Sequence, residues 1–363
     1  MNARTLLMAT TALAMFAGPT LATEISFSPV KFPETDAEKR AVLAAEAVAV
    51  DGKAYPIGYN VLLRSGDMGF GTLFDRDGQP VKKSDGSTHV SVDADFSSLI
   101  EVGDKLYGIT HFEALPGEMY VTELSRDDAG KLAAVSTKPV DFKADGGLWW
   151  PCAGSVTPWN THLGSEEYPA NARDIEAATK IEDIDDEFKP IARYFGLDPA
   201  TMTLDAFRAA YDPYRNGYIN EVAIAGDGTV TAKKHYAAGR LSVELGYVMP
   251  DRKTVYITDD GTNVGLFRFV ADKEADLSAG TLSVARWTQT SADGAGAADL
   301  AWIELGHADN AGVARLIEAG TKFADIFEVA DIADDGSCPA GFLSSNADEK
   351  SECLQVRDGM ELA

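Results

Sequence analysis

The sequence predicts an all-β fold, built either as propeller blades or as a sandwich. Two observations support this prediction. Short alternating or apolar runs are broken by Asp-Gly and Gly turns, which is the strand–turn–strand pattern of β-hairpins. These hairpins follow one another with few long amphipathic stretches between them, and in places they recur about every 40 residues, a spacing that favours propeller blades.

The predicted strands and hairpins begin at about residue 55. They cover residues 58–66, 97–112, 118–136, 217–237 and 253–271. The acidic turns within and between them, such as "DRDGQP", "RDDAGK" and "GDGTV", could suggest calcium loops. None has the full twelve-residue calcium-binding pattern with its closing glutamate, so we interpret them as ordinary hairpin turns.

One region departs from the strand pattern. Apolar residues at three- and four-residue spacing predict short helices inserted around residues 173–210, with Thr203 as the N-cap of the last one. The stretch 321–332 returns to a strand-like pattern, and the small residues around 291–297 predict a connecting loop.

The N-terminus predicts export. Residues 1–22 contain a basic start, an apolar middle and small residues at Thr20 and Ala22, which is the order found in a signal peptide. We therefore expect cleavage after Ala22, a periplasmic or secreted product, and a single domain from residue 23 to 363. Beyond this segment no apolar run approaches membrane-spanning length, so no membrane association is expected.

The composition limits the partners. A formal net charge of −25 over 363 residues repels nucleic acid and anionic membrane surfaces. It also repels phosphorylated or carboxylated substrates unless bound cations reverse the local potential.

Three cysteines raise the question of pairing. Cys338 and Cys353 flank a polar loop and, in an oxidising compartment, predict a disulfide. Cys152 is then left over. It could be buried and inert, it could pair with another chain, or a metal could hold it as a thiolate.

Acidic residues in strand-like surroundings offer partners for such a metal. Glu166 and Glu167 are adjacent, so on a strand one of them would point inward. An unpaired carboxylate inside a sheet is costly, so each of these residues should have a cation or a hydrogen-bond donor nearby. Calcium suits oxygen ligands and iron suits a thiolate. The candidate metal ligands are Cys152, Glu166, Glu167, Glu221, Glu244, Asp259 and Asp260.

Four blocks of the sequence resemble the PhoX-type secreted alkaline phosphatases. The most specific is "CAGSVTPWNTHLGSEE", which has the family pattern C-x-G-x-x-T-P-W-x-T-x-L-x-x-E-E. Three others follow in the family's order, and the resemblance runs from about residue 55 to the C-terminus. They are "GYINEV", "GRLSVE" and "VYITDD", at residues 217–222, 239–244 and 255–260.

The resemblance implies a β-propeller that hydrolyses phosphate monoesters at an iron–calcium cluster in its central channel. Cys152 would be an iron ligand and Glu244 a metal carboxylate, with Glu166 and Glu167 as candidates for the same cluster. Thr157 and Arg240 would shape the substrate site. The sequence contains no G-x-S-x-G motif, so it does not suggest a serine nucleophile instead.

The sequence differs from the family pattern in two respects. Val243 stands where the family has a histidine, and the later Arg–Glu motif of the family is not found. We therefore expect a chain that lacks the family's C-terminal blades, which a second polypeptide could complete. The alternatives are a catalytically inert binding module in which calcium joins the blades, or a calcium-dependent lactonase or esterase, although such enzymes do not require a thiolate.

Overall fold

The computed structural model describes residues 23–41, 43–261, 264–346 and 350–360. The expected signal peptide, residues 1–22, lies outside them. The chain divides into two compact units, one ending at Val61 and the other beginning at Leu62.

The first unit contains a small antiparallel sheet with the strand order β1-β2-β3. Its elements are β1 (Ile25–Phe27), α1 (Asp36–Lys39), β2 (Ala47–Val50) and β3 (Lys53–Pro56). Asp51 and Gly52 join β2 to β3, and both have positive φ values, 49° and 78°. This is the backbone that a two-residue hairpin turn requires, and Asp-Gly is a sequence that favours it.

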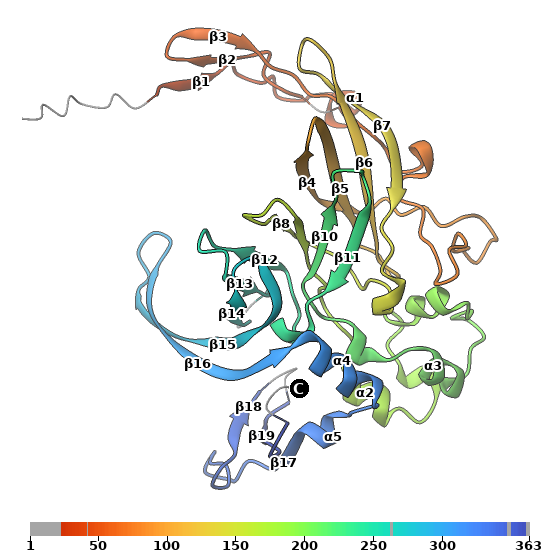
Figure 1. The fold of residues 1–363 in the computed structure, drawn as a ribbon, viewed down its shortest axis with the longest axis vertical. Coiled ribbons are helices and arrows are strands. Elements are labelled where there is room, and N and C mark those ends of the chain that lie inside the picture. Colours follow the sequence, from red (N-terminus) through yellow and green to blue (C-terminus); the bar gives the residue numbers. More distant parts are fainter. Residues whose placement is uncertain (1–22, 42, 262–263, 347–349, 361–363) are drawn as a thin grey trace, which may run out of the picture. The chain divides into compact units, whose positions relative to one another are not determined.

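The second unit contains the all-β fold that the sequence predicted (Figure 1). Three of its sheets are antiparallel and follow chain order from one edge to the other. The first contains β4 (Ala94–Val102), β5 (Lys105–Phe112), β6 (Glu118–Arg126) and β7 (Leu132–Pro139). The second contains β8 (Ser155–Val156), β9 (His162–Gly164), β10 (Asn220–Ile224) and β11 (Val230–Lys234).

The third sheet has five strands, and its last two form a long hairpin. It contains β12 (Leu245–Val248), β13 (Thr254–Thr258), β14 (Leu266–Lys273), β15 (Asp276–Ser291) and β16 (Ala297–Asp309). The first strand of the second sheet, β8, contacts the first strands of the other two sheets, β4 and β12. Contact between the first strands of successive antiparallel sheets is the arrangement of propeller blades around an axis.

The remaining elements follow the third sheet. Helix α4 (Asn310–Glu318) begins directly after β16 and buries Val313 and Ile317 against the third sheet. Helix α5 (Phe323–Ile326) leads into a three-stranded sheet with the order β17-β19-β18, formed by β17 (Phe327–Ala330), β18 (Leu343–Ser345) and β19 (Glu352–Val356). Cys338 and Cys353 form the predicted disulfide, which joins β19 to the loop before β18.

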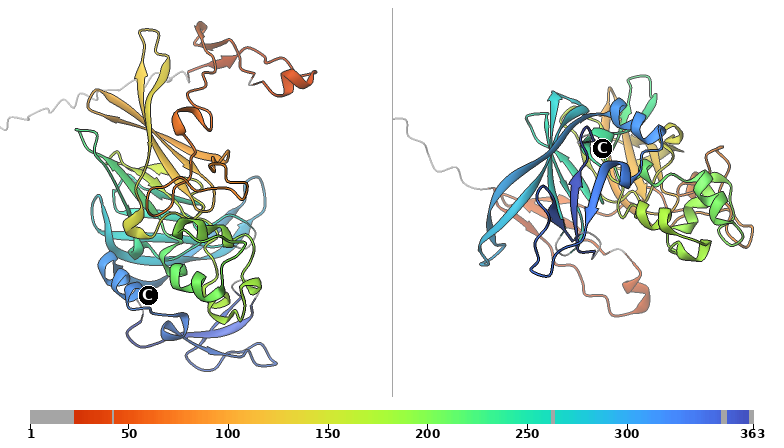
Figure 2. Two further views of the ribbon diagram at one scale, coloured as in Figure 1. Left: turned by 90° about the vertical axis from the view of Figure 1, so that its right-hand side faces the viewer. Right: turned by 90° about the horizontal axis from the view of Figure 1, so that it is seen from below.

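The predicted helical insertion is confirmed. It interrupts the second sheet between β9 and β10 and contains α2 (Ala172–Ala177) and α3 (Leu204–Ala210). The Thr203 hydroxyl accepts a hydrogen bond from the amide of Ala206 and caps α3, as expected. Figure 2 shows the insertion (green) and the β15–β16 hairpin (blue) on opposite sides of the unit.

Short 3₁₀ helices fill the connections. They are η1 (Asp67–Gly69), η2 (Lys143–Asp145), η3 (Ile181–Asp183), η4 (Lys189–Phe195), η5 (Pro213–Arg215) and η6 (Tyr236–Ala238). The acidic turns at Asp75 and Asp127 are hairpin turns, because each aspartate accepts hydrogen bonds from amides two and four residues later.

Two predictions about strands were wrong. The stretch 58–66 forms no strand within the described residues, because alternation alone does not supply a neighbouring strand to pair with. Residues 323–326 are helical rather than extended, and only the following residues pair as β17. Within the described part of the chain, no helix has the length and apolar character needed to cross a membrane.

Candidate metal centre

Cys152 lies in the loop that leads into β8, and hydrogen bonds fix its backbone on both sides. Its amide donates to the Ser165 hydroxyl at 3.2 Å. Its carbonyl oxygen accepts from Nδ1 of the buried His111. The thiol itself is half-buried and unpaired. The loop thus presents one sulfur atom from a fixed backbone position.

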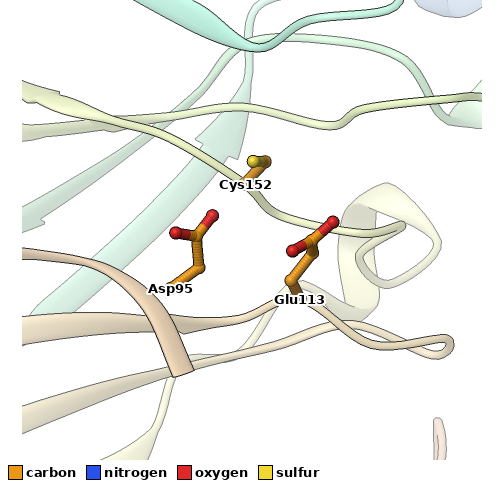
Figure 3. Close-up of side chains that lie close together, drawn as sticks. All are labelled: Asp95, Glu113 and Cys152. Carbon is orange, nitrogen blue, oxygen red and sulfur yellow. The ribbon is translucent and has the colours of Figure 1, made fainter. Parts of the chain in front are cut away.

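Four carboxylates surround this thiol in two groups. Asp95 and Glu113 form one group with Cys152, and Glu167 and Glu244 form the other. Within each group the possible ligand atoms all lie within 4.8 Å of one another. Figure 3 shows the carboxylates of Asp95 and Glu113 directed toward the side of Cys152.

All three blade-like sheets contribute to these groups. Asp95 lies in β4, and Glu113 directly follows β5. Glu167 follows β9, and Glu244 directly precedes β12. Residues from different sheets can meet here because β8 lies against both β4 and β12. We refer to Asp95, Glu113, Cys152, Glu167 and Glu244 as the thiol–carboxylate cluster.

Crowding of acids in this cluster raises several pKa values. Burial, hydrogen bonds from the thiol to Asp95 and Glu244, and the nearby Glu167 charge all raise the pKa of Cys152. Burial raises the pKa of Glu167 to about 7; a hydrogen bond with Tyr168 opposes this and the charge of Glu244 adds to it. Burial, followed by the charges of Asp95 and Glu244, raises the pKa of Glu113.

A buried chain of polar side chains supports the cysteine loop. His111 Nε2 lies 2.6 Å from His162 Nε2, and His162 Nδ1 lies 2.9 Å from the Ser98 hydroxyl. Burial lowers the pKa of His111 to about 4. The ring is therefore neutral near pH 7, and its hydrogen bonds are those of a neutral imidazole. The backbone of Cys152 is therefore tied to β4, β5 and β9.

Comparison with known proteins identifies the family of this chain. The family model of the alkaline phosphatase PhoX matches residues 128–338. The chain belongs to the PhoX family. Among curated proteins none matches. A solved structure of PhoX from Pseudomonas fluorescens in complex with vanadate, a transition state analogue, is similar with 19% identity and a TM-score of 0.42. The match covers 68% of this chain and 58% of that one, so the chain spans under two thirds of its length.

Of the two adjacent glutamates in the PhoX motif, the structure brings only Glu167 to the cluster. Glu166 is fully buried and forms an ion pair with Lys234 at 2.8 Å. It also accepts hydrogen bonds from three backbone amides and the Asn216 side chain. With five donors around it, this carboxylate stabilises the fold and has no oxygen directed to the thiol.

Glu221 was predicted from its strand-like surroundings and Thr157 from the PhoX resemblance, and both belong to a second polar network. The Glu221 carboxylate accepts from His235, Thr161 and Trp159 at 2.6–2.9 Å. Burial alone would raise the pKa of Glu221, but these hydrogen bonds together lower it. The Thr157 hydroxyl lies 2.7 Å from that of Thr161, so it supports Glu221 indirectly.

Arg240 and Val243 have structural roles as well. The Arg240 guanidinium donates to the carbonyls of Pro213 and Ala170 and lies over the Tyr214 ring. Val243 is fully buried in the core of the third sheet, and its amide donates to the Glu166 carbonyl. Within the described residues, Arg240 forms no hydrogen bond or ion pair with a member of the thiol–carboxylate cluster.

Asp259 and Asp260 lie near the edge of the cluster rather than in it. Their charges raise the pKa of Tyr168, although the largest contribution comes from the hydrogen bond between Tyr168 and Glu167. Asp259 also forms a hydrogen bond with Ser242, whose hydroxyl accepts from the Tyr168 amide. The two aspartates thus reach the cluster through Tyr168.

The sequence analysis missed Asp95, Glu113 and Tyr168. Asp95 and Glu113 precede the segment that the PhoX family model matches, so the motifs could not point to them. The one available signal is an acid at the beginning or end of a predicted strand, and among 57 acidic residues that signal selects too many candidates.

The donor set fits a mixed metal centre. One thiolate and four carboxylates combine the soft ligand that iron accepts with the hard oxygens that calcium prefers. Among the described residues no arginine or lysine forms an ion pair with any of the five, so their charge is not balanced by the protein. The residues present therefore match the metals that the PhoX resemblance implies.

Proposed function

We propose that this protein is a secreted or periplasmic phosphomonoesterase whose thiol–carboxylate cluster holds iron and calcium. One observation carries the proposal: the cysteine of the PhoX motif lies within 4.8 Å of carboxylates from three different sheets. The disulfide between Cys338 and Cys353 supports export, because such bonds persist in oxidising compartments.

The cluster gives a physical reason for binding a phosphate monoester. The substrate is a dianion, and the protein's net charge of −25 repels it. Bound cations would supply the positive charge that attracts the phosphate group and polarises its bonds. Cys152, Asp95, Glu113, Glu167 and Glu244 would hold these cations near the axis formed by β4, β8 and β12.

Other residues would hold and orient these ligands. The Glu167 amide donates to the Trp150 carbonyl, and the Tyr168 hydroxyl forms a hydrogen bond with the Glu167 carboxylate. Tyr168 is exposed and has a φ of 45°, an uncommon backbone for a non-glycine residue. This turn places the phenol between Glu167 and the solvent from which substrate arrives.

The test is metal analysis of the purified protein together with hydrolysis of p-nitrophenyl phosphate. We expect iron and calcium in the wild type, with C152S losing iron and E244Q losing calcium. E101Q is the matched control, because Glu101 lies on β4 but is exposed and far along the strand from Asp95. Full hydrolysis by C152S with no bound metal would contradict the proposal. Calcium-dependent stability without hydrolysis would instead support a binding module.

A further inference from the structure

An open pocket of about 440 Å³ adjoins the thiol–carboxylate cluster. Glu113, a member of the cluster, forms part of its wall, together with Asp93, whose carbonyl accepts from the Glu113 amide. The rest of the wall comes from three other parts of the second unit: the hairpin at residues 81–89, the loop before Cys152, and the helical insertion. The pocket and the proposed reaction site therefore share Glu113.

The wall away from the cluster is basic. Lys83, His89 and Arg193 all line it, and we call this space the basic pocket. Within the described chain, neither Lys83 nor Arg193 has a carboxylate within 4.0 Å. The two cations are close enough to His89 to lower its pKa, after the larger effect of burial. In a chain with 57 acidic and 32 basic side chains, unpaired cations around one pocket are unexpected.

Hydrogen bonds hold His89 and Arg193 in this wall. The His89 amide donates to the Val81 carbonyl, and the His89 carbonyl accepts from the Leu73 amide, so this segment is paired on both sides. Arg193, on η4, donates to the Lys82 carbonyl at 3.2 Å and ties the helical insertion to the hairpin. His89 Nδ1 has no hydrogen-bond partner in the described part of the protein, so the fold does not use this atom.

Trp150 also lines the pocket. Its ring packs against Trp149 and Phe188, with ring centroids 5.5 Å and 6.0 Å away. Its carbonyl accepts from the Glu167 amide, which connects the pocket wall directly to a cluster ligand. A ring held on two sides offers a fixed surface to the carbon skeleton of a ligand.

The pocket also contains acids, which limits where an anion can bind. Asp93 and Glu113 stand on the cluster side, and Glu187 is exposed on the helical insertion. An anionic group would therefore bind at the far wall, next to Lys83, His89 and Arg193. A phosphate at the cluster and a second anion at this wall would belong to the same ligand.

We propose that the basic pocket binds the alcohol part of the substrate, and selects phosphate monoesters whose alcohol carries a second anionic group. This inference rests on the proposed function, since it assigns the phosphate of the same molecule to the thiol–carboxylate cluster. Lys83 and Arg193 bind the second anion by charge and hydrogen bonding, and Trp150 packs against the carbons between the two groups.

The experiment compares 6-phosphogluconate with sorbitol 6-phosphate, which differ only in a terminal carboxylate versus a hydroxymethyl group. For the wild type we expect kcat/KM to be about tenfold higher for 6-phosphogluconate, the effect of one or two partly solvated charge-assisted contacts. K83Q and R193Q should bring this ratio close to one. K82Q is the matched control, because Lys82 carries the same charge but lines no part of this pocket.

Calorimetric titration of both compounds separates this proposal from the proposed function. The wild type should bind 6-phosphogluconate more tightly, and K83Q should lose that preference while K82Q keeps it. Retained binding preference without hydrolysis of either compound would refute the phosphatase activity but support the pocket. Three results would each overturn the pocket proposal: the wild type hydrolyses both compounds with equal kcat/KM, K83Q and K82Q have equal effects, or the wild type shows no binding preference.

Discussion

Replacing Lys234 with methionine should destabilise the second unit severely. The Lys234 ammonium and the Glu166 carboxylate are 2.8 Å apart, and both side chains have no exposed surface. Lys234 also donates to the Arg215 carbonyl. In K234M the carboxylate would keep its amide donors but lose its only cation. Removing one partner of a buried ion pair costs about 3–5 kcal/mol, because the remaining charge stays buried without compensation.

The neighbouring lysine provides the control. Lys233 is 54% exposed and pairs with Glu221 at 3.2 Å, a carboxylate that also has His235, Thr161 and Trp159 as donors. Solvent screens such a pair, so K233M should cost about 1 kcal/mol or less. The two variants remove the same charge from adjacent positions on β11, and they differ in burial.

Urea unfolding followed by tryptophan fluorescence measures the difference. All five tryptophans belong to the second unit, so the signal reports that unit alone. The measurement is made in chelator, so that metal binding does not contribute. The double variant E166Q/K234M should lose less stability than the sum of the two single variants, by about 2 kcal/mol. A K234M protein as stable as K233M to within 1 kcal/mol would refute the structural role assigned to this pair.

Two further predictions concern other parts of the second unit. Burial holds the pKa of Glu118 well above its usual value, despite hydrogen bonds from the Met119 and Phe74 amides. The folded state therefore keeps a proton that the unfolded state loses above about pH 4.3, so the free energy of unfolding should fall as pH rises. E118Q should remove this pH dependence, which is measured as the urea midpoint at several pH values. The disulfide encloses a sequence separation of 15 residues. Replacing Cys338 and Cys353 with alanine should cost about 3 kcal/mol in the loop-entropy description, seen as a lower Tm; an unchanged Tm would contradict it.

The sheets of the second unit could be predicted because their signals are local. Alternation and Asp-Gly turns define a hairpin within about 15 residues, and the strand β10, its turn and β11 appeared where this pattern placed them. Helix α4 was missed for the opposite reason. Asp309 is both the last residue of β16 and the N-cap of the helix, so no turn residues separate the two elements in the sequence.

The pair Glu166–Glu167 shows where sequence reasoning about the site had to stop. Adjacent residues on a strand point to opposite sides, so one of the two was expected to point inward, but the sequence analysis kept both as candidate ligands. Which one depends on Lys234 from β11 and on the amides of residues 217 and 218, all of which approach Glu166. Those contacts are set by the packing of the helical insertion against the second sheet, and no local pattern encodes them.

The same limit applies to Asp95 and Glu113. Asp95 is an ordinary residue of β4 and Glu113 an ordinary residue after β5, and each becomes part of a site only because β4 lies against β8. By contrast, Cys152, Glu167 and Glu244 could be proposed from the PhoX motifs. The motifs identify these residues but give no physical reason why they meet. Functional residues that come from separate sheets are therefore the part of a site that is hardest to predict from a single sequence.

Like charges in the thiol–carboxylate cluster repel one another, so something must hold them together. Each of three ligands is fixed by a backbone hydrogen bond of its own residue: Glu113 to the Asp93 carbonyl, Glu167 to Trp150, and Glu244 to Thr258. These bonds do not depend on the charge of the side chain. The backbone therefore keeps the carboxylates close before any cation binds. A cation that enters the cluster is attracted by all of them, and its binding free energy is not reduced by an entropic cost of bringing ligands together from separate sheets.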